Sequence, residues 1–256
     1  MTGLLALVGG VVGLMAGSFI NVVAYRVPLG KSVVLPRSAC PECGHEIRGR
    51  DNVPVLSWLL LRGRCRDCGT GISLRYPLVE AGTAAVFAAL AFLIGASWAL
   101  PAYWWAGGVA IALTLTDVDV RRIPDRILGP GVAVTAVLLT AGAFGDGEPM
   151  ALGRALAGGA AYFTLLLAVA PAARGGFGFG DVKLGFLLGM ILAYRSWEVL
   201  AVGAFAAFAV GGLVAVGLLL ARRVKRKDAI PFGPAMVVGA GVALGWGEAI
   251  VRWYLG

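Results

Sequence analysis

Long apolar segments without charged residues recur along the chain. A helix that crosses a bilayer needs about 20 predominantly apolar residues. Five segments meet this length or come close to it: residues 3–25, 127–145, 155–173, 199–221 and 229–247. The first one lacks a basic N-terminal region and a small-residue cleavage site, so we expect a membrane helix there, not a signal peptide. The pattern predicts an all-α integral membrane protein.

Two further apolar segments need separate treatment. Residues 81–116 are long enough for two helices, and Pro101, which lies among three tryptophans, predicts a turn between them at the membrane interface. Residues 182–194 are too short for a full span, so we expect a tilted helix or one shielded by protein. The prediction is a polytopic bundle of about eight transmembrane helices.

The composition supports this class. Hydrophobic residues make up 59% of the chain and charged residues only 14%, whereas about a quarter of a soluble domain is charged. Too little polar surface remains to cover a large soluble core. The class of large soluble proteins is therefore excluded.

The basic residues predict how the chain is oriented. Of the 22 Lys and Arg residues, 19 fall in residues 26–76, 118–126, 174–183 and 222–228. The positive-inside rule places these segments in the cytoplasm and both termini outside. The net charge of +8 and the basic run at 222–227 indicate attraction to anionic lipid and a topology anchor, not nucleic-acid binding. We expect a multi-pass protein of the inner membrane.

A polar segment at residues 26–76 separates the first predicted helix, at 1–25, from the remaining membrane region, at 77–256. It contains two C-x2-C pairs, Cys40/Cys43 and Cys65/Cys68, separated by 21 residues. Two such pairs typically supply four thiolates to one tetrahedral Zn²⁺. The cytoplasm keeps thiols reduced, which favours a metal over disulfide or redox use. The segment is too small to fold on an apolar core alone, so we predict a structural zinc.

His45, the only histidine, lies two residues after Cys43. It is an alternative ligand, but four cysteines already complete a closed zinc shell, so a role outside the shell is favoured. A closed shell leaves no position for water. The predicted zinc is therefore not the catalyst.

Two aspartates lie beside apolar segments on the predicted cytoplasmic side. Asp117 ends one long apolar run, and Asp181 follows Gly178-Phe179-Gly180 at the start of another. Two carboxyl groups held close together share a proton, so one acts as a base toward water and the other as an acid toward a carbonyl oxygen. The glycines before Asp181 would allow an extended substrate backbone to approach. Glu80 and Glu248 also lie near span ends, where helix capping or solvation explains them.

Other hydrolytic machinery is missing from the sequence. The single histidine lies in the cysteine segment, which leaves Ser-His-Asp and Cys-His catalysis without a base, and no H-E-x-x-H motif occurs. G-x-G-D is a short and weak signal. On these residues alone, proteolysis and carboxylate-gated ion or proton transport remain equal alternatives, with a zinc-bearing membrane scaffold as a third.

Several ordered motifs together are more specific. In chain order they are 17–28 (GSFINVVAYRVP), 40–47 (CPECGHEI), 52–54 (NVP), 57–58 (SW), 75–80 (RYPLVE), 117–125 (DVDVRRIPD), 178–183 (GFGDVK) and 230–234 (IPFGP). With the Cys65/Cys68 pair, this series resembles the bacterial type IV prepilin peptidase family, also called type IV leader peptidase/N-methyltransferase. The resemblance extends over nearly the whole chain.

The resemblance implies a membrane aspartic endopeptidase with Asp117 and Asp181 as its catalytic pair. It implies that the substrates are type IV prepilins and type II secretion pseudopilins, cut after the glycine of a short basic leader on the cytoplasmic side. It implies zinc on the four cysteines and methylation of the new N-terminus by S-adenosylmethionine. No glycine-rich nucleotide fingerprint supports the methyl transfer independently.

Three assignments around the pair remain expectations. Asp119 is an alternative to Asp117, but residues two apart on a helix face different sides, so only one should face Asp181. Gly178, Gly180 and Lys183 are the predicted substrate-binding residues. Lys183 is alternatively a cation that tunes the pair or a lysine that extends to the membrane interface.

Overall fold

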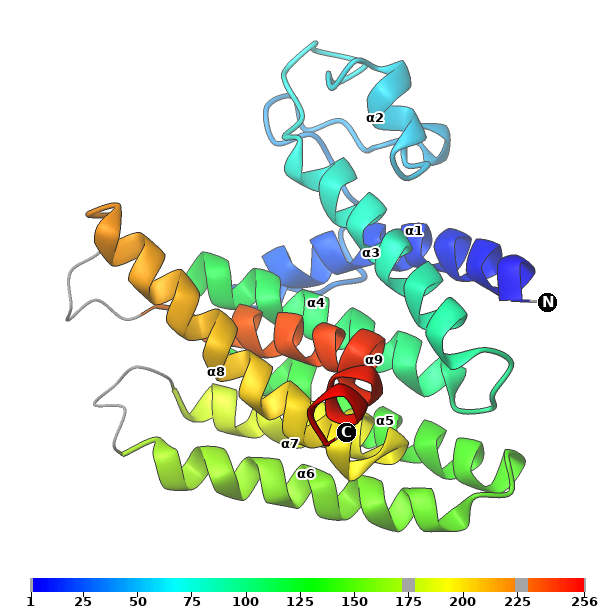
Figure 1. Ribbon diagram of the computed structural model, residues 1–256. Helices are drawn as coiled ribbons and strands as arrows, with labels where there is room; N and C mark the ends of the chain where they lie inside the picture. The colour runs from blue at the N-terminus through cyan, green and yellow to red at the C-terminus, as the bar shows by residue number, and fades with distance from the viewer. Residues whose placement is uncertain (1, 172–177, 224–229, 256) are drawn as a thin grey trace. The chain divides into compact units, whose positions relative to one another are not determined.

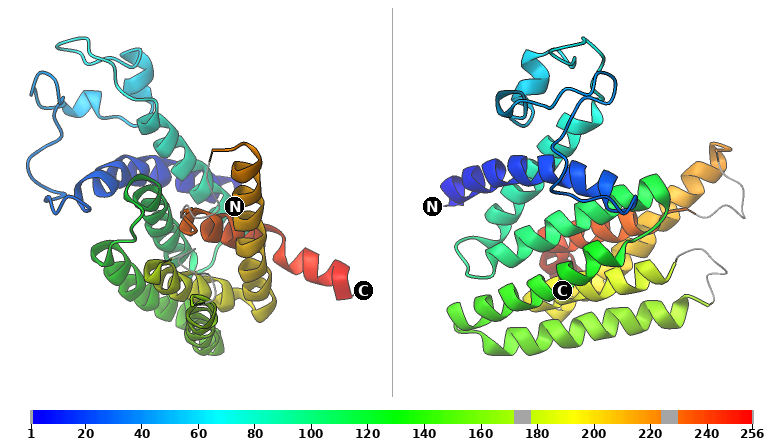
Figure 2. Two further views of the ribbon diagram at one scale, coloured as in Figure 1. Left: turned by 90° about the vertical axis from the view of Figure 1, so that its left-hand side faces the viewer. Right: turned by 180° about the vertical axis from the view of Figure 1, so that it is seen from behind.

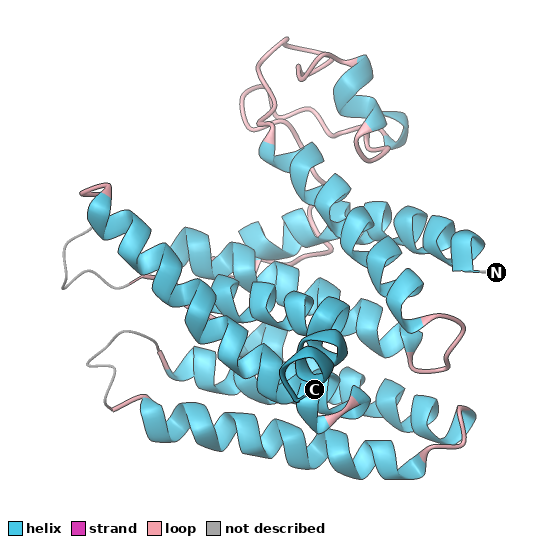
Figure 3. Cartoon of the chain, in the orientation of Figure 1, coloured by secondary structure: helices cyan, strands magenta, loops and turns pink. Residues whose placement is uncertain are grey.

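The computed structural model describes residues 2–171, 178–223 and 230–255. Within these residues the secondary structure is helical, without strands, as Figure 3 shows. The chain divides into two compact units, Met1–Ala96 and Ser97–Gly256. The predicted all-α fold is confirmed.

The first unit contains two long helices, α1 (Thr2–Arg26) and α3 (Arg75–Ile94), which cross closely in Figure 1. Glycines on α1 make this approach possible. A Cβ added at Gly13 would lie 2.6 Å from Cα of Ala84, and one at Gly17 would lie 2.7 Å from Cα of Glu80. Small residues let membrane helices pack backbone against backbone, which explains part of the high glycine content.

The segment between α1 and α3 is mostly irregular and holds only the 3-10 helix η1 (Gly49–Asp51) and the short helix α2 (Leu56–Leu60). Two isolated antiparallel bridges, Ala39 with Glu46 and Arg64 with Gly71, each close a loop that carries one cysteine pair. Gly44 and Gly69 directly follow the second cysteine of each pair, and both have φ of +73°. Glycine adopts this left-handed conformation without steric cost, so the two loops turn back in the same way.

The second unit is built from α4 (Leu100–Val120), α5 (Asp125–Gly145), α6 (Pro149–Val169), α7 (Phe179–Arg195), α8 (Trp197–Leu220) and α9 (Gly233–Leu255). The views in Figure 2 and Figure 1 agree that α6 and α7 run side by side. Gly189 of α7 allows this contact, because a Cβ there would lie 2.7 Å from the carbonyl oxygen of Gly158. Twelve of the seventeen residues of α7 are buried, so the predicted short, shielded helix is confirmed.

All eight predicted long helices occur in the described residues. Six of them, α1, α3, α5, α6, α8 and α9, are long and apolar enough to cross a membrane. Helices α4 and α7 do not meet that criterion, and these two carry Asp117 and Asp181. Pro101 lies in the first turn of α4, as the predicted turn requires. The predicted span ends at 173 and 229, and most of the basic run at 222–227, lie outside the described residues.

Candidate active site and metal centre

Asp181 lies in the first turn of α7, and its side chain closes back on the start of the helix. The backbone N–H of Gly178 donates a hydrogen bond to Oδ2 of Asp181 over 2.8 Å. A carboxylate at this position accepts a hydrogen bond from an N–H group that the helix leaves unpaired. The helix dipole also favours its negative charge. The other carboxylate oxygen, Oδ1, is buried and has no hydrogen-bond partner among the described residues. This oxygen is available for a substrate or a water.

Asp117 lies in the last turn of α4 and is only 6% exposed. Its Oδ2 accepts a hydrogen bond from the backbone N–H of Gly233, the first residue of α9, over 3.2 Å. Figure 1 shows the end of α4 and the beginnings of α7 and α9 at the same end of the second unit. The two aspartates are therefore brought together by the ends of three helices.

Both carboxylates lie close to Gly233. A Cβ added at Gly233 would lie 2.9 Å from Oδ2 of Asp117 and 3.6 Å from Oδ1 of Asp181. Both carboxylates therefore border the same small space, which only a residue without a side chain leaves open. Two carboxyl groups with this geometry titrate as a pair and can activate a water between them.

Asp119, the alternative to Asp117, is exposed, whereas Asp117 is buried. This difference follows from helix geometry, because residues two apart point to different sides. The geometry favours Asp117 as the partner of Asp181.

The two glycines before Asp181 have different surroundings. A Cβ at Gly180 would lie 2.8 Å from Cβ of Ile123, so this glycine allows the loop between α4 and α5 to pack on the start of α7. Among the described residues, a Cβ at Gly178 would meet no atom closer than 3.9 Å. Of the two positions, Gly178 is the one with open space beside it.

Lys183 forms an ion pair with Asp125, with its Nζ 2.7 Å from Oδ1 and 2.9 Å from Oδ2. The lysine also lies over the ring of Phe179, 5.0 Å from its centre. Asp125 begins α5 and Lys183 lies in the first turns of α7. The ion pair therefore joins the starts of two helices next to the aspartates.

The four predicted cysteines converge in the first unit. Their sulfur atoms all lie within 4.8 Å of one another, and Sγ of Cys40 is 3.8 Å from Sγ of Cys68. Zn–S bonds of about 2.3 Å in a tetrahedron separate the sulfurs by about 3.8 Å, so the cluster fits a metal ion of this kind. The same separation is far too long for a disulfide.

Within the cluster, the surroundings of Cys40 favour its thiolate form. Backbone N–H groups of Cys43 and Glu42 lower the pKa of the Cys40 thiol to about 7. A thiolate is the form of cysteine that binds a metal. His45 is not among the residues that come together as possible ligands.

The chain is similar to known proteins along most of its length. Residues 11–94 match the Bacterial Peptidase A24 N-terminal domain, and residues 104–216 match the Type IV leader peptidase family. The chain is 35% identical over 271 residues to a protein of Aeromonas hydrophila, covering 94% of this chain and 91% of that protein. The chain belongs to the type IV leader peptidase family.

Other relatives of this member of the type IV leader peptidase family come from other bacteria. A protein of Pseudomonas putida is 37% identical over 269 residues, covering 94% of this chain and 90% of its own. One from Bacillus subtilis is 33% identical over 247 residues, covering 95% of both chains. All three relatives are named prepilin leader peptidase/N-methyltransferase. No solved structure matches the chain.

No role is predicted from the sequence for three residues that lie near the two aspartates. Gly233, Ile123 and Asp125 were recognised only as parts of motifs, without a role. Gly233 is separated from Asp117 by 116 positions in the chain, and Asp125 is 58 positions from Lys183. The only available signal was a glycine between Phe232 and Pro234, where a small residue indicates a close approach.

Proposed function

We propose that this chain is a membrane aspartic endopeptidase that removes the basic leader of type IV prepilins and pseudopilins. The cut follows the leader glycine, at the cytoplasmic face of the inner membrane. The observation that carries the proposal is the convergence of two buried carboxylates, Asp117 and Asp181, on the space beside Gly233. The names of the relatives supply the class of substrate.

Each residue of the pair has a defined task in this mechanism. One carboxylate takes a proton from a water whose oxygen attacks the scissile carbonyl carbon, while the protonated partner donates to the carbonyl oxygen. The tetrahedral intermediate then expels the amine, which takes a proton from the pair. The N–H groups of Gly233 and Gly178 each hold one carboxylate oxygen, which leaves Oδ1 of Asp181 to face the water. The fixed oxygens keep the pair oriented before the substrate arrives.

The substrate enters this site as an extended chain, with its apolar stem in the lipid and its basic leader at the cytoplasmic boundary. Gly178 borders its path, because open space lies beside this glycine. Gly180 and Lys183 shape the same path without bordering it. Gly180 packs against Ile123, and Lys183 forms an ion pair with Asp125. This assignment refines the predicted substrate-binding set.

Two further chemical groups belong to the proposal. Cys40, Cys43, Cys65 and Cys68 hold a structural zinc, which the separation of their sulfurs fits. S-adenosylmethionine, when bound, would supply an electrophilic methyl group to the amine freed by cleavage; the amine would lose a proton, and S-adenosylhomocysteine would be the leaving group. We assign residues 1–25 to an anchor helix, 26–76 to the cytoplasmic zinc domain and 77–256 to the peptidase region.

The membrane orientation is also proposed. The concentration of Lys and Arg in four segments supports a cytoplasmic location for the zinc domain and for the aspartates. The transporter alternative has no support in the family to which the chain belongs.

Cleavage by the purified protein tests the function. The purified protein is mixed with a detergent-solubilised prepilin, and the products are weighed by mass spectrometry. We expect one cut after the leader glycine and, when S-adenosylmethionine is added, one extra methyl group on the mature product. If no precursor is cut by zinc-loaded protein and liposomes show ion or proton flux, the transporter account replaces this one.

A further inference from the structure

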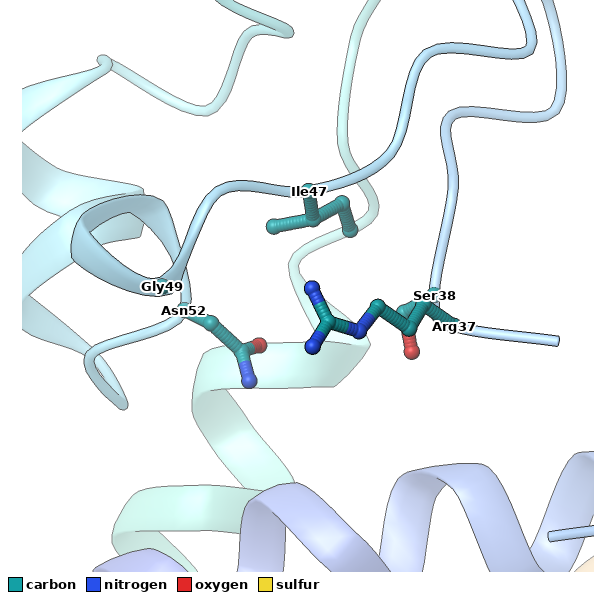
Figure 4. A pocket seen from close by; sticks show the side chains of 5 residues that line it. All are labelled: Arg37, Ser38, Ile47, Gly49 and Asn52. Atoms are coloured by element: carbon teal, nitrogen blue, oxygen red, sulfur yellow. The ribbon is translucent and has the colours of Figure 1, made fainter. Parts of the chain in front are cut away.

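Helix α9 contributes its first residue, Gly233, to the space beside the aspartates, so the place of that residue depends on what holds the start of α9. The cleft shown in Figure 4 lies in the first unit, and none of the residues that line it belongs to a helix that carries an aspartate. These residues are Arg37, Ser38, Ile47, Gly49 and Asn52. The residues that hold α9 lie on α8, in the second unit.

Helix α8 lies beside α9, as Figure 1 shows. A Cβ added at Gly239 of α9 would lie 2.5 Å from the backbone nitrogen of Ala207 on α8. The two backbones therefore pack directly against each other, as helices with small residues at their interface do. This contact fixes the register of α9 on α8.

Nearer to the aspartates, the side chain of Phe232 packs on α8. The centre of its ring lies 5.4 Å from the centre of the Phe208 ring. A Cβ added at Gly211 would lie 2.8 Å and 3.1 Å from two carbon atoms of the Phe232 ring. The ring therefore occupies a place on α8 that is open only because residue 211 has no side chain. We call the packing of Phe232 on Phe208 and Gly211 the Phe232 contact.

The backbone of Phe232 connects this contact to the aspartates. The carbonyl oxygen of Phe232 accepts a hydrogen bond from the N–H of Met236 over 3.1 Å, at the start of α9. The same peptide unit carries the N–H of Gly233, which donates to Oδ2 of Asp117 over 3.2 Å. A peptide unit is planar and rigid, so its carbonyl and N–H groups cannot turn independently. A movement of Phe232 therefore changes the direction of the N–H that holds Asp117.

We propose that Phe232 is a positioning residue for the aspartate pair and that α8 supplies its anchor through the Phe232 contact. It acts through the peptide unit that joins it to Gly233. The role rests on the proposed endopeptidase function. It gives α8, which carries neither aspartate, a part in the geometry of catalysis.

The test is steady-state cleavage of one prepilin by the full-length protein and its variants. Gly211→Ala places a methyl group where the Phe232 ring lies, so the ring and the N–H of Gly233 should be displaced. A misplacement of about 1 Å costs about 100-fold in rate, and only part of the movement reaches Gly233, so kcat should fall about tenfold with KM nearly unchanged. Gly212→Ala is the matched control, because an added Cβ there meets no atom of the described chain within 4 Å. It should cleave at the wild-type rate.

A shorter side chain at position 232 should rescue the Gly211→Ala variant. Phe232→Leu alone leaves part of the space beside Gly211 empty, and kcat should fall by a smaller factor than in Gly211→Ala. In the double variant, the added methyl group takes up the space that leucine leaves. The double variant should therefore be more active than Gly211→Ala, whereas two independent losses would multiply.

Gly203→Ala separates positioning from a general loss of packing. A Cβ at this position of α8 would lie 2.6 Å from Cδ1 of Leu192, so it crowds the same helix away from the Phe232 contact. Each variant is assayed well below the midpoint of its own thermal unfolding, so that a lower kcat reports the site and not the folded fraction. Gly203→Ala should then keep the wild-type kcat.

Three results would overturn the role of Phe232. They are equal kcat values for Gly211→Ala and Gly212→Ala, a fall in Gly203→Ala as large as that in Gly211→Ala, and a double variant no more active than Gly211→Ala. Wild type cleaves prepilin in all three cases, so the endopeptidase proposal would stand. A wild type that cleaves no prepilin would overturn that proposal and this role together.

Discussion

The backbone N–H of Gly233 donates a hydrogen bond to Oδ2 of Asp117, across 116 positions of sequence. The contact brings the start of α9 to the end of α4, and it leaves Gly233 between the two carboxylates. The glycine acts in two ways: its N–H holds one aspartate, and its missing side chain keeps the space between the pair open.

Gly233→Ala should therefore abolish most of the activity. The added methyl would lie 2.9 Å from Oδ2 of Asp117, so the carboxylate of Asp117 must shift from its place beside Asp181. Displacement of a catalytic group by about 1 Å costs about 100-fold in rate, and we expect a loss of at least that size in kcat for prepilin cleavage. Gly241→Ala, on the same helix with no atom within 4 Å of the added Cβ, is the matched control and should cleave normally. Equal activity of the two variants would remove Gly233 from the site.

Gly180→Ala and Gly178→Ala should have different kinetic effects. A Cβ at Gly180 would collide with Ile123 and displace the start of α7, which carries Asp181, so kcat should fall. A Cβ at Gly178 has room in the protein but enters the proposed substrate path, so KM should rise with kcat nearly unchanged. Steady-state cleavage of one prepilin by both variants measures the difference. A fall in kcat for Gly178→Ala alone would reverse the two roles.

The ion pair between Lys183 and Asp125 should contribute modestly. The side chains are 34% and 70% exposed, and exposed pairs stabilise by about 0.2–1 kcal/mol, so either Lys183→Gln or Asp125→Asn should lower cleavage by up to about fivefold. The charge-swapped protein, with Asp125→Lys and Lys183→Asp, should recover most of the loss. If Lys183 contacts the substrate itself, Lys183→Gln will raise KM well beyond the effect of Asp125→Asn, and the swap will not restore it.

The cysteine cluster should hold one metal ion that keeps its segment folded. Cys40→Ser should reduce zinc from about one ion per chain to near zero, because a four-thiolate shell loses a ligand. Residues 26–76 should then become sensitive to protease, because binding of a structural metal contributes directly to folding. His45→Ala should retain zinc and protease resistance. Zinc loss in His45→Ala with retention in Cys40→Ser would assign the ligands differently.

The sequence alone was sufficient to predict the helices and the cysteine cluster. Apolar runs of spanning length identify membrane helices because a bilayer has a fixed thickness. The two C-x2-C pairs predict a cluster that can hold a metal ion, because this arrangement is typical of four-thiolate sites. Asp117 and Asp181 were recognisable because a carboxylate beside an apolar run is costly unless it has a use.

Helix ends were harder to predict where a charge is satisfied by distant residues. Helix α6 begins at Pro149, not at 155, and Arg154 lies within it, where its Nε donates to the carbonyl oxygen of Ala193 over 2.6 Å. Helix α9 extends to Leu255, beyond 247, and Glu248 within it pairs with Arg195 at 2.8 Å. A charge ends an apolar run in sequence, but it does not end a helix when a partner lies nearby in the fold.

The most direct test of the central claim compares three aspartate variants in one cleavage assay. Asp117→Asn and Asp181→Asn should each lower prepilin cleavage at least about 100-fold, because each removes an acid or base from the pair, while the variants keep their fold and zinc. Asp119→Asn, two residues away and exposed, should cleave at close to the wild-type rate. Near-normal cleavage by either Asp117→Asn or Asp181→Asn would contradict the catalytic pair.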